Sequence, residues 1–422
     1  MYLNQIAIYR FSLAFILIVY ADIFGLISLS DYNLSIKYSY ALIILIFISI
    51  ECLRWRAFDV NSRAPIIALL FFVVTAISFT INVIFYDERS SYVSAFTSSL
   101  VFAVAAFIPP SAIKLDASRI LNQILFVLLL ASTFYMLETI LKTNDEHVKS
   151  IICVLGLCLC ILAGRHALAG IFAVITVVAL LMRPTSTLAI ALMICIPLSL
   201  MLKFRALGLS RIIVNGALLF AGLLPFAIYY FPDSIGSVLT AFEETIKADY
   251  LSGHSNNALR LAILTEALRA FENSSILIGN GMNGNTNAFI GNVYPDWPEL
   301  GPGNEGFASI HSDFVIMLTQ GGLIGYGIFL AMLYFVGRGR FNKLKLLGNH
   351  TQDVGSLTSS SIVALVAVIV YCSVNPFLQQ YQIAHSVWML FFISEVVGKS
   401  TVNRKYRAGL AKVDRTISGV CA

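Results

Sequence analysis

Long apolar stretches with few charged residues recur along almost the whole chain, and short polar segments separate most of them. One of them, 64–86, contains no charged residue and is long enough to cross roughly 30 Å of hydrocarbon as a helix. Twelve such stretches occur, at 6–30, 38–51, 64–86, 91–108, 120–141, 150–163, 166–182, 186–202, 212–231, 313–336, 360–377 and 383–397. The pattern therefore predicts an all-α polytopic membrane protein with about twelve transmembrane helices.

The composition excludes several classes of soluble protein. Of the 422 residues, 58% are apolar and only 12% are Asp, Glu, Lys or Arg, with a mean hydropathy of +0.83. This charged fraction is about half that of a soluble domain, so a soluble enzyme and a nucleic-acid-binding protein are excluded. The seven cysteines form no disulfide framework and no CxxC metal pattern, which excludes a secreted disulfide scaffold.

The distribution of basic residues predicts the orientation. With twelve spans both termini lie on one side, and 20 of the 28 Lys and Arg residues fall on that side, against 8 on the other. The positive-inside rule therefore places both termini in the cytoplasm. The expected organisation is nine spans over 1–231, an outer loop over 232–309, three spans over 310–397 and a basic cytoplasmic tail over 398–422.

The outer loop is the longest connection, and long connections in compact proteins usually carry function. Within it, NNALRLAILTEALRAFE (256–272) has helical periodicity and places Arg260 in the middle of the apolar face. That face also carries Leu264, Ala267 and Phe271, and the opposite face carries Thr265, Glu266, Arg269 and Glu272. A guanidinium on an apolar face needs a partner, which is either an internal carboxylate or a bound anion.

His311 stands at the start of the predicted tenth span, in IHSDFVIMLTQGGLIGYG (310–327). The positive end of a helix disfavours imidazolium, which keeps the ring neutral and able to accept a proton. A structural histidine is the alternative, and a metal site of His311 with Asp313 is a weaker one because no further ligand has suitable spacing. Gly321 and Gly325 have GxxxG spacing, which predicts close packing against another helix.

Arg183 is the basic residue between the seventh and eighth spans, on the outer side. Arginines at the outer end of a span run against the orientation rule, so this position calls for a functional explanation. The alternative is an arginine whose side chain extends to the membrane interface without a further role.

Five features follow one another between about 180 and 330: an arginine that opens a span, a basic inner loop, a loop arginine, a Gly-rich stretch and a histidine before a Gly-rich turn. They are Arg183, KFRALGLSR (203–211), Arg260, ILIGNGMNG (276–284), His311 and GGLIG (321–325). This order resembles the bacterial O-antigen ligase and O-antigen polymerase superfamily. The chain departs from the family pattern at Met182, at 261–264, at 273–275 and at Ser312, and Arg165 competes with Arg183 for the first arginine position.

The resemblance implies a GT-C-like enzyme of the bacterial inner membrane that transfers a glycan from undecaprenyl diphosphate to an acceptor sugar hydroxyl at the periplasmic face. Arg183 and Arg260 would bind the diphosphate, because guanidinium groups bind phosphates through two parallel hydrogen bonds. His311 would act as the general base. Tyr294 and Trp297 would stack on sugar rings, or pack within the loop. The donor is already activated, so neither a metal ion nor another cofactor is expected.

Polymerase and ligase differ in the acceptor, which is a lipid-linked repeat unit for the first and lipid A–core for the second. The outer loop holds three basic and nine acidic residues, and so carries a net charge of −6. Because this charge would repel a phosphorylated core, the sequence slightly favours the polymerase. The alternatives are the ligase and, from another class, a lipid-linked glycan flippase. Expected partners are the donor, the acceptor, membrane lipids and other polysaccharide-assembly proteins, and no nucleic acid.

Overall fold

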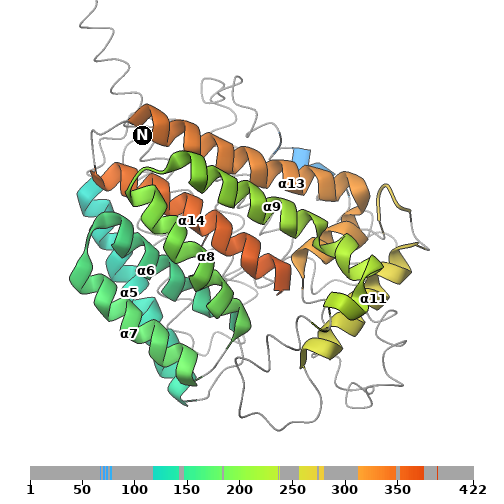
Figure 1. Cartoon of the computed structure of the whole chain (residues 1–422), viewed down its shortest axis with the longest axis horizontal. Coiled ribbons are helices and arrows are strands. Elements are labelled where there is room, and N and C mark those ends of the chain that lie inside the picture. The colour runs from blue at the N-terminus through green and yellow to red at the C-terminus, as the bar shows by residue number, and fades with distance from the viewer. Residues whose placement is uncertain are drawn as a thin grey trace, which may run out of the picture.

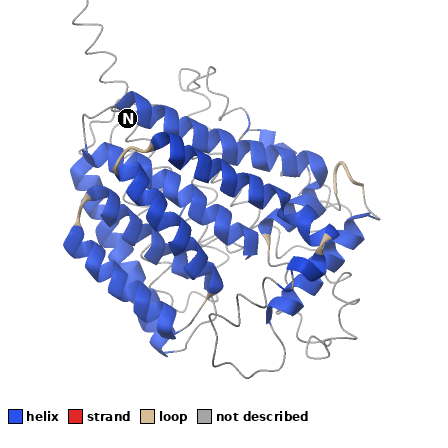
Figure 2. Ribbon diagram, viewed as in Figure 1, coloured by secondary structure: helices blue, strands red, loops and turns tan. Residues whose placement is uncertain are grey.

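The computed structural model describes 117–141, 147–182, 185–235, 237, 256–272, 275–279, 312–347 and 352–374, together with isolated positions at 67, 70, 71, 73, 74, 77 and 387. Within this part the chain is helical and contains no strand (Figure 2). The first, second and fourth predicted spans lie outside the described residues, as do most of the third and of the twelfth.

Nine helical elements make up the described part of the chain (Figure 1). They are α5 (Ala117–Leu141), the 3-10 helix η3 (His147–Ser150), α6 (Ile151–Ala163), α7 (His166–Met182), α8 (Ser186–Lys203), α9 (Leu207–Tyr230), α11 (Asn256–Glu272), α13 (Asp313–Leu347) and α14 (Gln352–Val374). Among them, α5, α8, α9, α13 and α14 are long and apolar enough to cross a membrane, while α6 and α7 are shorter apolar helices. Several long apolar helices thus indicate a membrane protein, as predicted.

The helices extend beyond the apolar stretches mainly where basic residues follow or precede them. The predicted span 212–231 becomes α9, which begins at Leu207, and 313–336 becomes α13, which ends at Leu347. Arg and Lys are good helix formers, so the helix continues past the end of its apolar stretch. Hydropathy therefore marks the membrane-crossing part of a helix and not its full length.

Two helices, α6 and α14, form the centre of the bundle. All thirteen residues of α6 except Ile161 are buried, and α6 packs against α5, α7, α8 and α14. In turn, α14 contacts α13, α8 and α9, and Figure 1 shows α9 and α13 side by side along one flank. At roughly 1.5 Å per residue α6 is only about 20 Å long, so its neighbours and not its own length keep it within the apolar interior.

An apolar stripe on α7 faces outward. Its large exposed side chains are Ile171, Val174, Val177 and Leu181, at a helical spacing of three to four residues. A contiguous apolar stripe of this kind is costly in water and ordinary in lipid. The stripe therefore supports the membrane assignment independently of helix length.

One cavity shows which helix ends lie together. It is lined by residues from the last turns of α6, α8 and α13 and the first turns of α9 and α14, among them Leu162, Lys203, Leu207, Leu347 and Gln352. We call this the basic end of the bundle, because most described Lys and Arg side chains lie here. The other end, where α11 contacts α9 and α13, is called the α11 end.

The positive-inside rule predicts that the basic end is cytoplasmic and the α11 end periplasmic. A reporter inserted between 285 and 306 should therefore report a periplasmic location, and one inserted within 348–350, between α13 and α14, a cytoplasmic location. Paired alkaline phosphatase and fluorescent protein fusions would measure this. Reversed signals at both positions would overturn the orientation and the role expected of Arg183.

Candidate functional site

Most of the predicted site residues lie outside the part of the chain that the structure describes. This holds for Arg183, Tyr294, Trp297 and His311, whereas Arg260 lies in α11 with its backbone described and its side chain not. The elements that flank these positions are described, and they locate the ends of the segments that carry them.

The apolar face of α11 packs onto the membrane-spanning bundle. Its buried residues include Ile263, Leu264, Ala267 and Leu268, and α11 contacts both α9 and α13. Arg260 precedes Leu264 by four residues, so both positions lie on the same side of the helix. The predicted apolar face is confirmed for Leu264 and Ala267, and the backbone of Arg260 lies on the side that meets the bundle.

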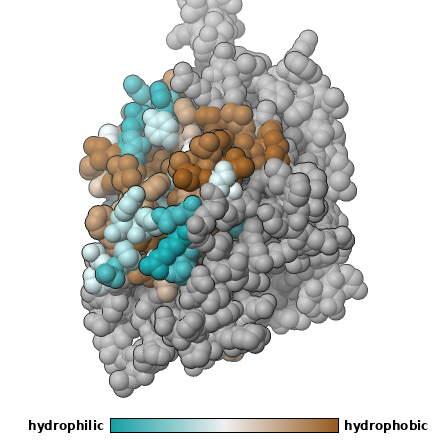
Figure 3. Space-filling view, turned by 90° about the vertical axis from the view of Figure 1, so that its right-hand side faces the viewer, coloured by the Kyte–Doolittle hydropathy of each residue, from teal (hydrophilic) through white to brown (hydrophobic). Residues whose placement is uncertain are grey.

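The opposite face of α11 is mostly solvated, as predicted. The side chain of Arg269 is 62% exposed and forms an ion pair with Glu266, and the Tyr229 hydroxyl of α9 donates a hydrogen bond to Glu272. The prediction was wrong for Thr265, which is buried and donates a hydrogen bond of 2.8 Å from Oγ1 to the Leu261 carbonyl. A helix that contacts two neighbours buries a wider arc than a helix that rests on one surface. Figure 3 shows apolar and hydrophilic side chains next to each other on this side of the molecule.

Ser312, directly after His311, anchors the start of α13. Its hydroxyl donates to the Cys372 carbonyl of α14 at 3.4 Å and accepts from the Val315 backbone N–H at 3.4 Å. The Ser312 carbonyl accepts the first helical hydrogen bond, from Ile316. Ser312 therefore acts as an N-cap, a role that serine and asparagine fill equally well. The position after His311 is thus held against the end of α14.

Asp313, in the first turn of α13, is buried and not solvated. It is 1% exposed and interacts with the Cys372 thiol. An anionic side chain is favoured at this end of a helix by the partial positive charge of the backbone N–H groups. Among the described residues no group of three His, Cys, Asp or Glu side chains is placed to hold a metal ion.

The helix α13 is broken at Gly322, the tenth of its 35 residues. This residue has φ 63° and ψ −172°, which is not helical. Two backbone N–H groups beyond the break bond to the outer loop: Leu323 donates to the Ile276 carbonyl at 2.9 Å, and Ile324 donates to the Leu277 carbonyl at 3.1 Å. An interrupted helix inside a membrane protein needs such partners for its backbone groups. The loop turn at 275–279 supplies them.

The turn approaches the break closely enough that neither side tolerates a side chain. Gly279, with φ 69°, would place a Cβ 2.6 Å from the Gly322 nitrogen, and a Cβ on Gly322 would overlap the Leu277 carbonyl. The Gly279 N–H closes the turn on the Ser275 carbonyl at 2.6 Å. The Gly-rich stretches of the loop and of α13 are therefore two halves of one contact, which we call the glycine contact (275–279 with Gly322).

The glycine contact does not involve Gly321 and Gly325, the two glycines with GxxxG spacing. Both are buried in α13, and among the described residues nothing lies within 4 Å of a Cβ built on Gly325. The close approach in the described part of the chain occurs at Gly322, and its partner is a loop turn. Helix packing at Gly321 and Gly325 stays a prediction.

Substitutions test the glycine contact. Gly322→Ala or Gly279→Ala should lower the free energy of unfolding by about 3 kcal/mol, because each adds a clash with backbone to the strain of a positive φ. Thermal unfolding of the purified protein in detergent would measure this, with protease cleavage within 280–306 as a second readout. Gly327→Ala, at an exposed position on the same helix, is the matched control and should be neutral or slightly stabilising. Equal stability of all three variants would contradict the contact.

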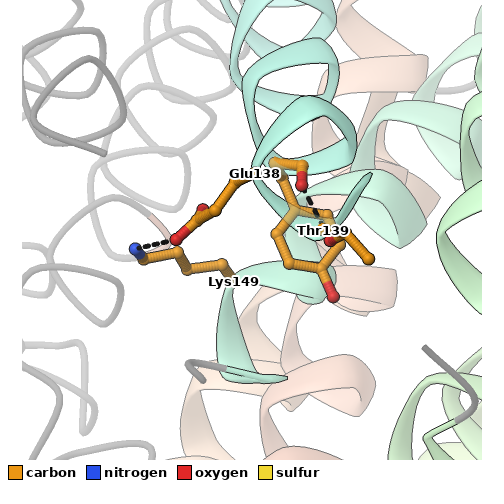
Figure 4. Close-up of polar contacts among 4 residues, drawn as sticks. Glu138, Thr139 and Lys149 are labelled. Atoms are coloured by element: carbon orange, nitrogen blue, oxygen red, sulfur yellow. Dashed lines mark hydrogen bonds and ion pairs between the residues drawn. The ribbon is translucent and has the colours of Figure 1, made fainter. Parts of the chain in front are cut away.

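A buried ion pair lies at the end of α5, and sequence reasoning did not single it out. The Lys149 ammonium of η3 lies 3.3 Å from Glu138 Oε1, and both side chains are at least 95% buried (Figure 4). Next to Lys149, the Ser150 hydroxyl lies 2.6 Å from the Tyr371 hydroxyl of α14. The sequence feature that could have indicated this ion pair is Glu138, the only charged residue in the predicted span 120–141. These contacts join α5, η3 and α14 at the end where Ser312 meets Cys372.

One candidate for the first arginine, Arg183, lies outside the described residues, but the helix that follows it is described. This helix, α8, begins at the α11 end of the bundle, because its last residue, Lys203, lies at the basic end. The other candidate, Arg165, follows α6 at the basic end, where its guanidinium donates to the Asn122 side chain of α5 at 3.4 Å. The start of α8 thus shares an end of the bundle with Ser312 and α11, and Arg165 does not.

Cysteines contribute packing in the described part of the chain. Cys153, Cys158, Cys160, Cys195 and Cys372 are all free and buried. Cys158 and Cys160 both belong to the hydrophobic core of the bundle.

No protein-family model matches the chain, and a search among curated proteins finds no match.

Proposed function

We propose that this chain is an inner-membrane glycosyltransferase that transfers a glycan from undecaprenyl diphosphate to a sugar hydroxyl at the periplasmic face. One observation carries most weight: α11, the start of α8 and the start of α13 share one end of the bundle. These are the segments that contain or adjoin Arg260, Arg183 and His311. A site for a lipid diphosphate needs such convergence, since two guanidinium groups and a base must reach one substrate.

The proposed roles follow from side-chain chemistry. Arg183 and Arg260 bind the diphosphate and neutralise the charge that develops as it leaves. His311, kept neutral at the start of α13, accepts the proton of the acceptor hydroxyl as that oxygen attacks the anomeric carbon. Tyr294 and Trp297 stack on sugar rings. The donor already carries a good leaving group, so the reaction needs no metal ion, nucleotide or redox cofactor.

The polymerase is the favoured reaction because the outer loop carries a net charge of −6, which suits a neutral or weakly charged glycan acceptor better than a phosphorylated core. Transfer to lipid A–core by a ligase is the second candidate. A flippase would need charged or polar side chains along a path through the membrane. In the described helices the buried charged side chains are Glu138, Lys149, Asp313 and Arg340, and all four lie near helix ends.

Lipopolysaccharide profiling of a strain that lacks the gene tests the proposal. Loss of the polymerase should leave core that bears one repeat unit, whereas loss of the ligase should leave bare core and polymer retained on undecaprenyl diphosphate. Loss of the flippase should leave bare core and single repeat units confined to the cytoplasmic side. An unchanged profile, with every other surface polysaccharide also intact, would overturn the proposed function.

A further inference from the structure

A cavity of about 310 Å³ opens between α9, α13 and α14 near the basic end. Its polar lining comes from matching positions on two helices: Arg211 and Asn215 on α9, and Arg338 and Asn342 on α13. Residues four apart lie on the same side of a helix, so each helix presents one guanidinium and one amide to the cavity. None of the described residues that line it is acidic.

Both arginines are available to an anion. In the described part of the chain no carboxylate lies within ion-pair distance of Arg211 or Arg338. The Arg211 guanidinium lies 5.6 Å from the centroid of the Phe341 ring, a cation–π contact that orients the group without using its N–H donors. Two arginines with no acidic partner at the mouth of one cavity form a site for a phosphate group.

The remaining lining is apolar, with Leu218, Leu333 and Ile369 among its side chains. The floor is narrow because α13 approaches its neighbours at Gly337, where a Cβ would lie 3.0 Å from Leu365 and 3.7 Å from Val214. The occupant that fits has an anionic head near the helix ends and an apolar body directed into the bundle. A soluble nucleotide or sugar phosphate has the first of these features and lacks the second.

We propose that this cavity binds an anionic phospholipid, with the lipid phosphate held by Arg211 and Arg338 and an acyl chain along Leu218 and Leu333. Basic pockets between transmembrane helices at the cytoplasmic side characteristically receive such headgroups. The site is distinct from the proposed glycan site: along α9, Arg211 and Tyr229 are separated by about 27 Å at roughly 1.5 Å per residue. The inference depends on the membrane location of the chain and not on the glycosyltransferase proposal.

Lipid titration of the purified, delipidated full chain, followed by native mass spectrometry, tests the site. Phosphatidylglycerol should bind at least tenfold more tightly than phosphatidylcholine with the same acyl chains. Glycerol phosphate should not bind at the concentrations at which phosphatidylglycerol binds. The double variant that carries both Arg211→Gln and Arg338→Gln should weaken phosphatidylglycerol binding roughly 30-fold. The single variant Arg338→Gln should weaken it about fivefold. Because both side chains are exposed, these variants should keep the thermal stability of the parent protein.

Lys345→Gln is the matched control, since it removes one exposed charge from the same end of α13 outside the cavity. It should change the affinity no more than twofold. Equal binding of the two lipids, or an equal loss in Lys345→Gln and Arg338→Gln, would show a general surface attraction and overturn the site. Binding of glycerol phosphate as tight as that of the lipid would identify a free-phosphate site and would overturn the lipid assignment.

Discussion

Arg260→Ala should abolish polymer synthesis while the protein remains folded and present at its normal level. The backbone of Arg260 lies on the side of α11 that meets α9 and α13, at the end of the bundle where α13 begins. If Arg183 and Arg260 bind the diphosphate as proposed, removing one of the two guanidinium groups leaves the diphosphate charge partly uncompensated in the transition state. Arg260→Lys should also lose most of the activity, because an ammonium group cannot form two parallel hydrogen bonds to one phosphate. Polymer on gels of the complemented deletion strain is the measurement, with immunoblots for the protein level.

Arg269→Ala is the control on the same helix. Its side chain is 62% exposed and its partner is Glu266 one turn earlier, a surface pair worth about 0.5 kcal/mol. This variant should therefore make polymer of normal length and amount. The assignment of the helical faces would be wrong if Arg269 proved essential and Arg260 dispensable. It would also be wrong if Arg260→Ala lost activity only in proportion to a loss of protein.

The spans were predictable wherever the apolar stretch and the helix have the same length. The predicted spans 150–163, 166–182 and 186–202 correspond closely to α6, α7 and α8. Polar or glycine residues such as Gly164 end these helices in the sequence as well as in space, and Gly164 has the left-handed conformation typical of a helix C-cap. The ends of α9 and α13 were less predictable, because good helix formers continue them beyond the membrane.

The face of α11 was predictable because a helix of period 3.6 separates its apolar and charged residues regardless of what it contacts. The burial of Thr265 was not. It depends on α11 contacting two helices, α9 and α13, at once, and on the threonine hydroxyl bonding to its own helix at Leu261. The sequence alone does not distinguish a buried threonine of this kind from a solvated one.

The glycine contact and the hydrogen bond beside the buried ion pair could not be predicted from the sequence for a different reason. Each joins residues whose proximity depends on the whole bundle: Leu277 with Ile324 across a loop, and Ser150 with Tyr371 across 221 positions of the chain. The Gly-rich segments were visible separately, and helix packing was the simplest interpretation of their spacing. Only the positive φ of Gly322 shows that the segment after it accepts a loop turn in place of a helix.

His311→Ala should lower the rate of glycan transfer roughly 100- to 10,000-fold, the usual contribution of a positioned general base. The prediction rests on the place of this residue before Ser312, which caps α13 and binds the Cys372 carbonyl, and on the order of residues in the sequence. Donor binding should survive in His311→Ala, because the proposal assigns the diphosphate to Arg183 and Arg260. The measurements are single-turnover transfer by purified protein and, separately, binding of the lipid diphosphate donor.

Two further observations separate a base from a metal ligand at this position. Activity should fall as the pH is lowered through the range in which imidazole becomes protonated, and it should persist in excess chelator. His166→Ala is the matched control: His166 is exposed and also stands at the start of an apolar helix, but at the basic end of the bundle, so its loss should be silent. Loss of activity in chelator with recovery on adding a divalent ion would contradict the general-base role. It would favour instead a metal ion held by His311 and Asp313, whose buried carboxylate follows the same helix cap.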